Sequence, residues 1–238
     1  MRMELMSPSR REVLRFGGAS AALTVAGRAS AMPADPWLHA AQIVRTVKAP
    51  QFPARTFDIT KYGAKGDGLA LNSDAIAKAV AACAAAGGGR VLVPAGTFLT
   101  GAVHLKSNVE LHLAEGATLR FSTDAAHYPI VLTRWEGMEL FNYSPLVYAY
   151  GQKNIAITGS GTLDGQGGAE HWWSWKGPWH GTVDGGWREG MPNQLPARKK
   201  LFEMAEAGVP VEKRVFGDGA YLRPVSYTHL TLPTNREV

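Results

Sequence analysis

The sequence predicts an all-β fold, a right-handed parallel β-helix that begins with a capping helix. Two observations predict it. Residues 87–121 hold a series of short β-type runs, each ended by Gly, Pro or a small polar turn, and a weaker copy of this segment follows further along the chain. Strands this short suit a solenoid, in which each coil buries its apolar face on the coil below.

The first copy divides into strands at its turn residues. Within its fourth strand Val109, Leu111 and Leu113 face one way, and Glu110 and His112 face the other. This alternation predicts one buried and one outward face. The predicted strands are Val91–Val93, Thr97–Thr100, Val103–Leu105, Val109–Leu113 and Thr118–Phe121.

The second copy, residues 146–165, aligns Asn154 with Asn108 and Gly161 with Gly116. The offset at the Asn is 46 residues (154 minus 108). We interpret it as two coils of roughly 20 residues, a common solenoid repeat. The alternative is an antiparallel sandwich, which also has short strands and regular turns.

Composition fits a turn-rich globular chain, with 45% apolar residues, 27 Gly and 14 Pro among 238 residues. The net charge of +5 owes +3 to residues 1–31, which hold five Arg and two Glu, and no Lys/Arg stripe points to nucleic acid. The single cysteine, Cys83, excludes an intrachain disulfide and is predicted to be a buried helix residue. No apolar run approaches the roughly 20 residues of a membrane span.

Residues 1–31 have the features of a twin-arginine export signal. Arg10-Arg11 precedes a Gly/Ala-rich apolar stretch, and Ala29-Ser30-Ala31 forms a small-x-small cleavage site. The signal predicts a bacterial protein that is periplasmic or secreted, with a mature chain starting at Met32. The alternative is a chance Arg pair. Residues 32–55 are predicted to be an irregular lead-in arm, and residues 56–224 the β-helix.

One helix is predicted over Asn72–Ala86, where it covers the open apolar end of the first coil. Asn72 is its predicted N-cap and Gly87 its terminator. An apolar stripe at helical spacing faces the coils. It consists of Ile76, Ala79, Val80 and Cys83.

Three later segments depart from the repeat. Ser122–Ser144 is predicted to be a loop or insertion between coils, Lys199–Ala207 a helix, and Arg214–Pro224 a return to β structure.

Gln166–Pro196 is rich in Gly and Trp. Trp172, Trp173 and Trp175 are predicted substrate-binding residues, because an exposed indole can stack on a sugar ring. The alternative is a loop whose Trp side chains pack on the flank of the solenoid.

Three stretches carry a family resemblance: TFDITKYGAKGDG, GGGRVLVPAGTFLTGAVHLKSNVELHLAEGATLRFSTD and FNYSPLVYAYGQKNIAITGSGTLDGQG. Together they are similar to the N-terminal part of glycoside hydrolase family 28, which contains polygalacturonases and rhamnogalacturonan hydrolases. The resemblance runs from about Thr56 to Pro224. Its opening stretch alone is shared with other pectin-active β-helix proteins and with phage tailspikes.

The resemblance implies a pectate-lyase-like right-handed parallel β-helix. It also implies inverting hydrolysis of α-1,4 galacturonosyl linkages in pectin by carboxylates, with no cofactor or metal. The implied partner is an acidic plant polysaccharide. The family's Asn-Thr-Asp, Asp-Asp, Gly-His-Gly and Arg-Ile-Lys motifs are all absent from this sequence. We therefore assign no catalytic residue; Asp164, Asp184 and Asp218 each adjoin Gly and are interpreted as turn residues.

Residues 225–238 break the pattern. Val225–Thr234, VSYTHLTLPT, resembles the translation of a transposase adapter used in sequencing libraries. We expect this tail to be artefactual and the chain to be an incomplete, inactive fragment of a longer enzyme. The alternative is a natural tail. Two other functions stay open: a β-helix lyase, commonly with Ca²⁺ on acidic side chains, and a carbohydrate-binding β-helix without chemistry. The pectic polymer, the endo or exo action and the oligomeric state stay open too.

Overall fold

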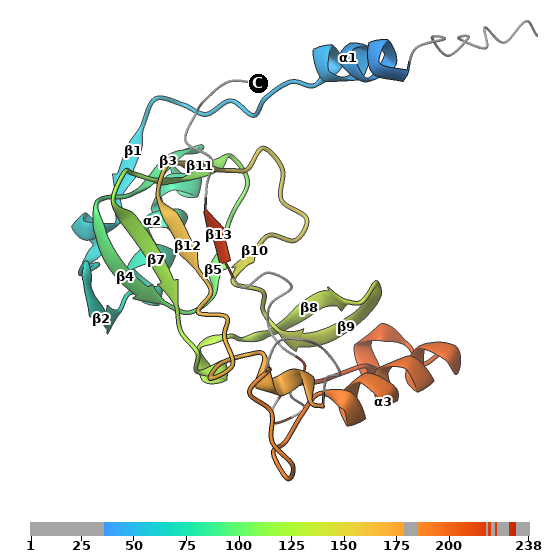
Figure 1. Ribbon diagram of the computed structural model, residues 1–238. Helices are drawn as coiled ribbons and strands as arrows, with labels where there is room; N and C mark the ends of the chain where they lie inside the picture. The colour runs from blue at the N-terminus through green and yellow to red at the C-terminus, as the bar shows by residue number, and fades with distance from the viewer. Residues whose placement is uncertain (1–35, 179–184, 218, 220–221, 223–228, 232–238) are drawn as a thin grey trace, which may run out of the picture. The chain divides into compact units, whose positions relative to one another are not determined.

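The computed structural model describes residues 36–178, 185–217, 219, 222 and 229–231, and the chain forms two compact units, Met1–Ala49 and Pro50–Val238 (Figure 1). The described part of the first unit contains helix α1, Pro36–Thr46. Pro is favoured in the first turn of a helix, and Leu, Ala and Gln then sustain it. The expectation of an irregular lead-in arm is therefore wrong over these residues. The predicted export signal lies outside the described residues.

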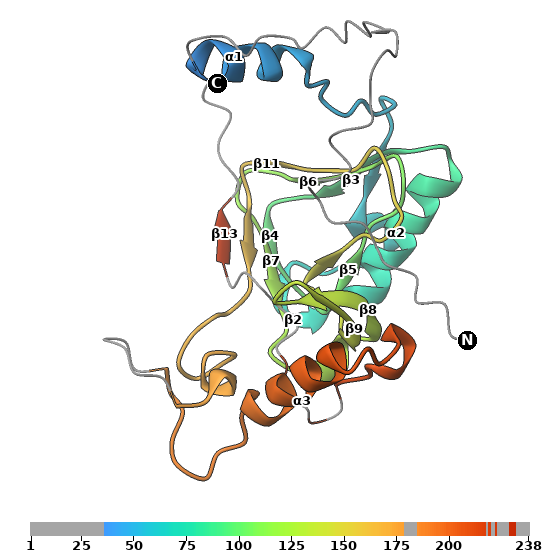
Figure 2. The same cartoon turned by 90° about the vertical axis from the view of Figure 1, so that its right-hand side faces the viewer.

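The second unit is built from parallel strands that pair between successive coils. Three parallel sheets result, and in Figure 2 two of them form different sides of the stack. The predicted parallel β-helix is confirmed, and the antiparallel sandwich is not. The first sheet consists of β1 (Thr56–Asp58), β3 (Gly89–Val93), β6 (Val109–Leu113) and β11 (Ala156–Gly159). The parallel strands of the second are β2 (Asp67–Leu71), β4 (Gly96–Thr100), β7 (Ala117–Phe121) and β12 (Thr162–Asp164). The third consists of β5 (Val103–His104) and β10 (Val147–Tyr148).

The spacing between coils differs from the prediction. Arg90 on β3 pairs with Glu110 on β6 at a separation of 20 residues. Glu110 in turn pairs with Ala156 on β11, which is 46 residues further along the chain but belongs to the very next coil. Thr158 likewise lies opposite His112 at a separation of 46 residues. The interpretation of this offset as two coils is wrong. It is a single coil that contains a long excursion from the stack, residues 122–146, between β7 and β10.

The excursion contains an antiparallel hairpin of β8 (Ile130–Trp135) and β9 (Met138–Tyr143), where the sequence predicted a loop. The turn residues Glu136 and Gly137 have φ values of 46° and 87°. Positive φ at both central residues is what a type I′ turn requires, and this turn matches the twist of the two strands. A single Glu-Gly pair is a weaker sequence signal than Asn-Gly or Asp-Gly, which explains why the hairpin was missed. A short 3₁₀ helix, η2 (Ala125–His127), precedes it.

Helix α2 (Ser73–Ala85) packs on the first coils as predicted, after the 3₁₀ helix η1 (Ile59–Tyr62). Its predicted stripe is buried in the main core. Asn72 does not cap the helix with its side chain; its amide instead bonds Lys65, Ala70 and Leu99 and so holds the preceding turn to β4. The main core unites α2 with inward-facing strand residues, among them Val91, Val93, Phe98, Val109, Leu111, Leu113, Leu119 and Phe121.

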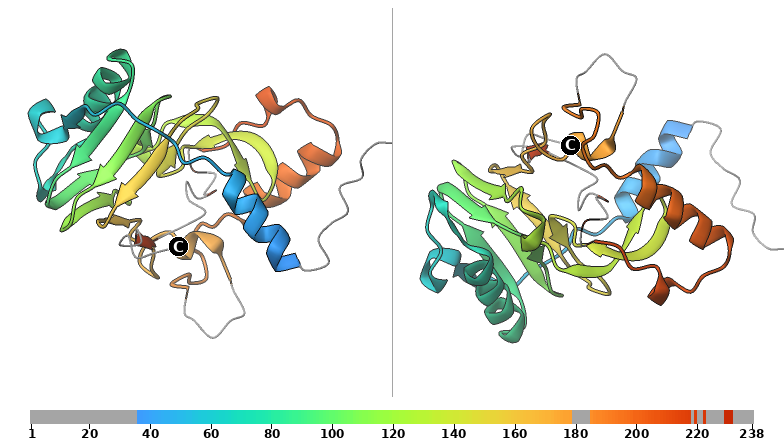
Figure 3. Two further views of the ribbon diagram at one scale, coloured as in Figure 1. Left: turned by 90° about the horizontal axis from the view of Figure 1, so that it is seen from above. Right: turned by 90° about the horizontal axis from the view of Figure 1, so that it is seen from below.

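A second hydrophobic cluster joins the hairpin to helix α3 (Leu195–Glu206). Figure 3 shows both elements set to one side of the stacked strands. Leu140, Leu201 and Phe216 are central to this cluster. In the described residues of the segment expected to return to β structure, one isolated bridge joins Val215 to Phe141, after the 3₁₀ helix η4 (Val211–Lys213).

Part of the tail also has backbone structure. Strand β13 (His229–Thr231) pairs antiparallel with β12, opposite in direction to the other strands of that sheet. Within the described residues, no helix has the length and apolar character needed to span a membrane.

Candidate functional site

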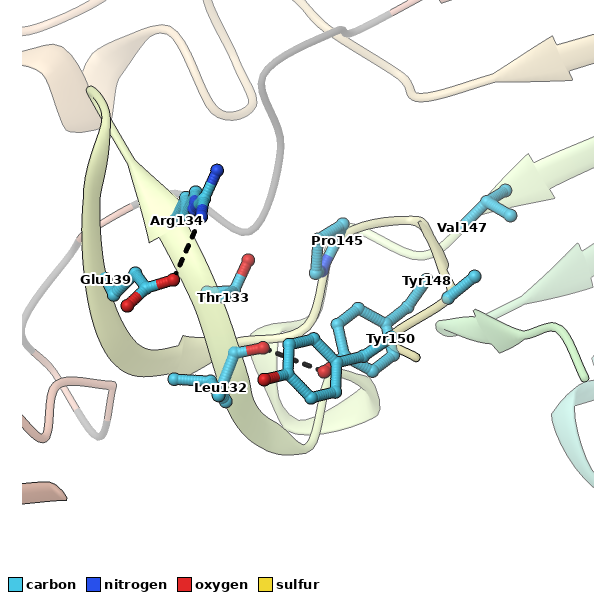
Figure 4. A pocket seen from close by; sticks show the side chains of 9 residues that line it. Leu132, Thr133, Arg134, Glu139, Pro145, Val147, Tyr148 and Tyr150 are labelled. Carbon is cyan, nitrogen blue, oxygen red and sulfur yellow. Dashed lines mark hydrogen bonds and ion pairs between the residues drawn. The ribbon is translucent and has the colours of Figure 1, made fainter. Parts of the chain in front are cut away.

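A pocket of about 310 Å³ lies between the hairpin and residues 145–150, the segment that contains β10 (Figure 4). We call it the hairpin pocket. The parallel pairing of β10 with β5 places this pocket next to the outward face of the third sheet, where Val103 is buried and His104 is exposed. It is lined by Leu132, Thr133, Arg134, Glu139, Pro145, Val147, Tyr148, Ala149 and Tyr150.

Tyr148 ties the two walls of the pocket together. Its hydroxyl donates a hydrogen bond to the Leu132 carbonyl at 2.8 Å, and its ring packs on His104 with centroids 5.0 Å apart. Burial, helped by the nearby Tyr150, raises the pKa of the Tyr148 phenol. Tyr148 therefore stays protonated at neutral pH and remains a hydrogen-bond donor.

The charged wall belongs to the hairpin. Arg134 and Glu139 occupy directly opposite positions in its register, and Arg134 Nη2 lies 3.0 Å from Glu139 Oε1. The two side chains are 73% and 46% exposed. Exposed ion pairs of this kind contribute little to stability. The Arg134 guanidinium is thus free to exchange partners with a ligand carboxylate.

A partly buried hydrogen-bond network fixes the base of the hairpin against β5. The Ser144 hydroxyl donates to the Pro145 carbonyl at 3.0 Å, so its oxygen is the acceptor for His104 Nε2 at 2.9 Å. Burial lowers the pKa of His104, and the imidazole is therefore neutral at pH 7 with its proton on Nε2. The Ser144 amide also donates to Pro129 at 2.8 Å.

A second polar group lies on the outward face of the first sheet. Glu110 accepts hydrogen bonds from Arg90 (2.9 Å) and Thr158 (2.7 Å), and Thr158 also contacts His112 at 2.8 Å. Burial raises the pKa of the Glu110 carboxyl, but the bonds from Arg90 and Thr158 outweigh burial and hold that pKa below its usual value. Both carboxylate oxygens are engaged, so we interpret this group as a bridge between three coils.

The predicted tryptophan platform is only partly available. Trp172 is 1% exposed, its indole N–H donates to the Gly165 carbonyl at 2.9 Å, and its ring meets Tyr128 edge to face. It belongs to a buried aromatic cluster with Tyr143, so its assignment as a sugar-stacking residue is wrong. Trp172 serves instead to hold its segment on the hairpin base.

Trp173 and Trp175 are half-buried and line no part of the hairpin pocket. Trp175 lies within the 3₁₀ helix η3 (Ser174–Lys176) and packs against Trp172 with ring centroids 5.3 Å apart.

The remaining residues singled out from the sequence are a cysteine and two aspartates. Cys83 is fully buried, as predicted, and burial raises the pKa of its thiol. Asp184 and Asp218 lie outside the described residues.

Sequence reasoning missed the residues of the hairpin pocket. Arg134 and Glu139 flank the Glu136-Gly137 turn symmetrically, which would have paired them had the hairpin been recognised. Their proximity to Tyr148 depends on the excursion folding back onto β10, and no local pattern records that. In the described part of the chain, no group of three or more His, Cys, Asp or Glu side chains is arranged to hold a metal ion.

Short parallel strands stacked in coils, with a mixed aromatic and charged pocket beside the third sheet, define a parallel β-helix protein. Comparisons with known proteins narrow the class. The crystal structure of a hyperthermoactive exopolygalacturonase from Thermotoga maritima matches with a TM-score of 0.72 and 53% identity, over 77% of this chain and 40% of that one. The predicted resemblance to polygalacturonases is therefore confirmed.

Curated relatives agree with the structural match. An exo-poly-α-D-galacturonosidase of Dickeya chrysanthemi is 43% identical over 121 residues, which are 48% of this chain and 20% of that protein. An exopolygalacturonase of Zea mays is 32% identical over 122 residues, 49% of this chain and 26% of that protein. No family model matches the sequence. The chain thus spans less than half the length of each of these relatives.

Proposed function

We propose that this chain forms the N-terminal coils of a polygalacturonase-type glycosidase that hydrolyses galacturonosyl linkages in pectin. The observation that carries the proposal is the match at 53% identity and a TM-score of 0.72 to the Thermotoga exopolygalacturonase. At that identity, the likeness goes beyond shared architecture.

The proposed substrate is an acidic galacturonan, in keeping with the names of the relatives. All three relatives described above are named for exo action, so release of units from a chain end is the form of the reaction to test first. Inverting hydrolysis uses one carboxylic acid to protonate the leaving oxygen and a second carboxylate to activate water. No residue of this chain is assigned to either role.

We propose export by the twin-arginine route for residues 1–31, supported by the Arg10-Arg11 pair and the Ala29-Ser30-Ala31 site. A reporter fused after Met32 tests it. Export should stop in a host without the twin-arginine translocase and when both arginines become Lys. Export that persists in both cases would refute the assignment.

The enzyme assignment is tested at the gene. We expect the source locus, read past the Pro224 codon, to encode Asn-Thr-Asp followed by Asp-Asp. Its product should release galacturonate from polygalacturonate with new reducing ends and no unsaturated product. Unsaturated ends would instead indicate a lyase. The 238-residue chain itself should show no turnover, because the family's catalytic motifs are absent from it.

A further inference from the structure

We propose that the hairpin pocket is a binding subsite for a single hexuronate unit, with Arg134 as the carboxylate receptor and Tyr150 as the sugar-stacking surface. The inference rests on the proposed function for its choice of ligand. It goes beyond that function because it assigns recognition to the excursion between coils. The excursion carries none of the family's catalytic motifs.

Arg134 is the lining group that can receive an acidic ligand. Among the nine described lining residues, Arg134 is the only cation and Glu139 the only anion. Arg134 presents a planar fork that matches a carboxylate in two parallel hydrogen bonds. Glu139 holds that fork at 3.0 Å, through an exposed pair that a ligand carboxylate can displace.

The rest of the lining suits a sugar ring. Tyr150 is 62% exposed, which leaves its ring accessible to the C–H face of a pyranose. Tyr148 is held in place by its bond to Leu132, so it acts as a rigid wall. Thr133 adds a hydroxyl among the lining side chains. This combination of one aromatic surface, one cation and a few polar groups is typical of small-ligand sites.

Size limits the occupant. At about 310 Å³, the pocket lies at the lower end of the roughly 300–1,000 Å³ seen for small-ligand sites. It suits one sugar unit rather than a run of several. The pocket lies beside β10, on the outward side of the third sheet. The other sugar units of a bound polymer would then extend along the sheet face that carries His104.

The test measures binding of trigalacturonate to the full chain by calorimetry, with the carboxyl-reduced trisaccharide as the neutral probe. Arg134→Gln should weaken trigalacturonate binding by about tenfold, as loss of a charge-assisted pair predicts. Glu139→Gln should strengthen binding by about threefold, because it removes the competitor for Arg134. Tyr150→Ala should weaken both probes.

Arg198→Gln is the matched control. Arg198 also pairs with a hairpin carboxylate, Glu136 at 3.0 Å, whose exposure of 45% matches the 46% of Glu139, but Arg198 lies outside the pocket lining. Its loss should leave binding unchanged. Opposite effects of Arg134→Gln and Glu139→Gln on trigalacturonate, absent for the neutral probe, support the proposal whether or not the longer gene product hydrolyses pectin.

Equal binding by all charge variants, or equal loss in Arg134→Gln and Arg198→Gln, would overturn the subsite and leave the proposed function standing. Failure of trigalacturonate to bind the unaltered chain would overturn it as well. Circular dichroism of each variant confirms that the fold is retained. Absence of hydrolysis by the longer gene product, with Arg134-dependent binding by this chain intact, would count against the proposed function alone.

Discussion

The side-chain amide of Asn154 donates a hydrogen bond to the amide oxygen of Asn108 at 2.9 Å, across 46 residues of sequence. Both residues have left-handed backbone conformations, with φ values of 54° and 64°. Asn tolerates this region better than other non-Gly residues. The same turn is therefore built twice and stacked on itself, and each Asn both permits its turn and joins it to its neighbour.

Replacing Asn154 separates these two contributions. Asn154→Gly keeps the left-handed backbone but loses the amide bonds to Asn108 and Gln51. It should lower the free energy of unfolding by about 1 kcal/mol. Asn154→Ala also strains the backbone and should cost about 1 kcal/mol more. Chemical denaturation measures both, and equal losses would show that backbone conformation is unimportant at this turn.

Glu110 predicts an acid-side loss of stability. Its folded pKa lies below the ordinary value of 4.5, so ionised Glu110 stabilises the fold above that value. This contribution falls away as pH drops through the folded pKa. Glu110→Gln should therefore melt at a lower temperature than the parent at pH 7, with the gap closing as the pH falls below 4.5 and through the folded pKa.

The comparison for this prediction is Glu139→Gln, whose ion pair is exposed. It should leave the pH dependence of melting nearly unchanged. A gap for Glu110→Gln that widens on acidification would contradict the sign derived for this carboxyl.

Trp172 is predicted to be structural. Trp172→Ala should lower the free energy of unfolding by about 3–5 kcal/mol, because it empties a buried site and leaves the Gly165 carbonyl without its donor. Trp173→Ala, at a half-buried position, should cost much less. Thermal melts provide the comparison. The same Trp173 variant, and Trp175→Ala, test the remaining proposal that these side chains stack on sugar.

Cys83 gives a probe of the main core. Its side chain lies on the buried face of α2, and burial raises the pKa of its thiol, so the reactive thiolate is scarce. A thiol-specific colorimetric reagent should react negligibly with the folded chain and stoichiometrically in denaturant. Rapid reaction without denaturant would show that α2 does not seal the first coils.

Much of the stack could be predicted from local pattern. Val109, Leu111 and Leu113 alternate with polar residues, and their buried faces follow from the two-residue period of a strand. The apolar stripe of α2 and its end at Gly87, with φ of 85°, follow equally from helical spacing and left-handed Gly. The repeated Asn marks the coil register, because its turn chemistry is local.

The excursion and its contacts could not be predicted in this way. Whether 46 residues make one coil or two depends on which strand lies beside β6, a pairing between distant segments. The local sequence around Trp172 does not distinguish a side chain that faces solvent from one that packs on Tyr128. Trp172 is buried because its segment packs against the base of the hairpin. Sequence determined the coils, since each carries its own period and turns. Tertiary structure alone decided the hairpin pocket, because Arg134 and Tyr148 meet only when the excursion folds back onto β10.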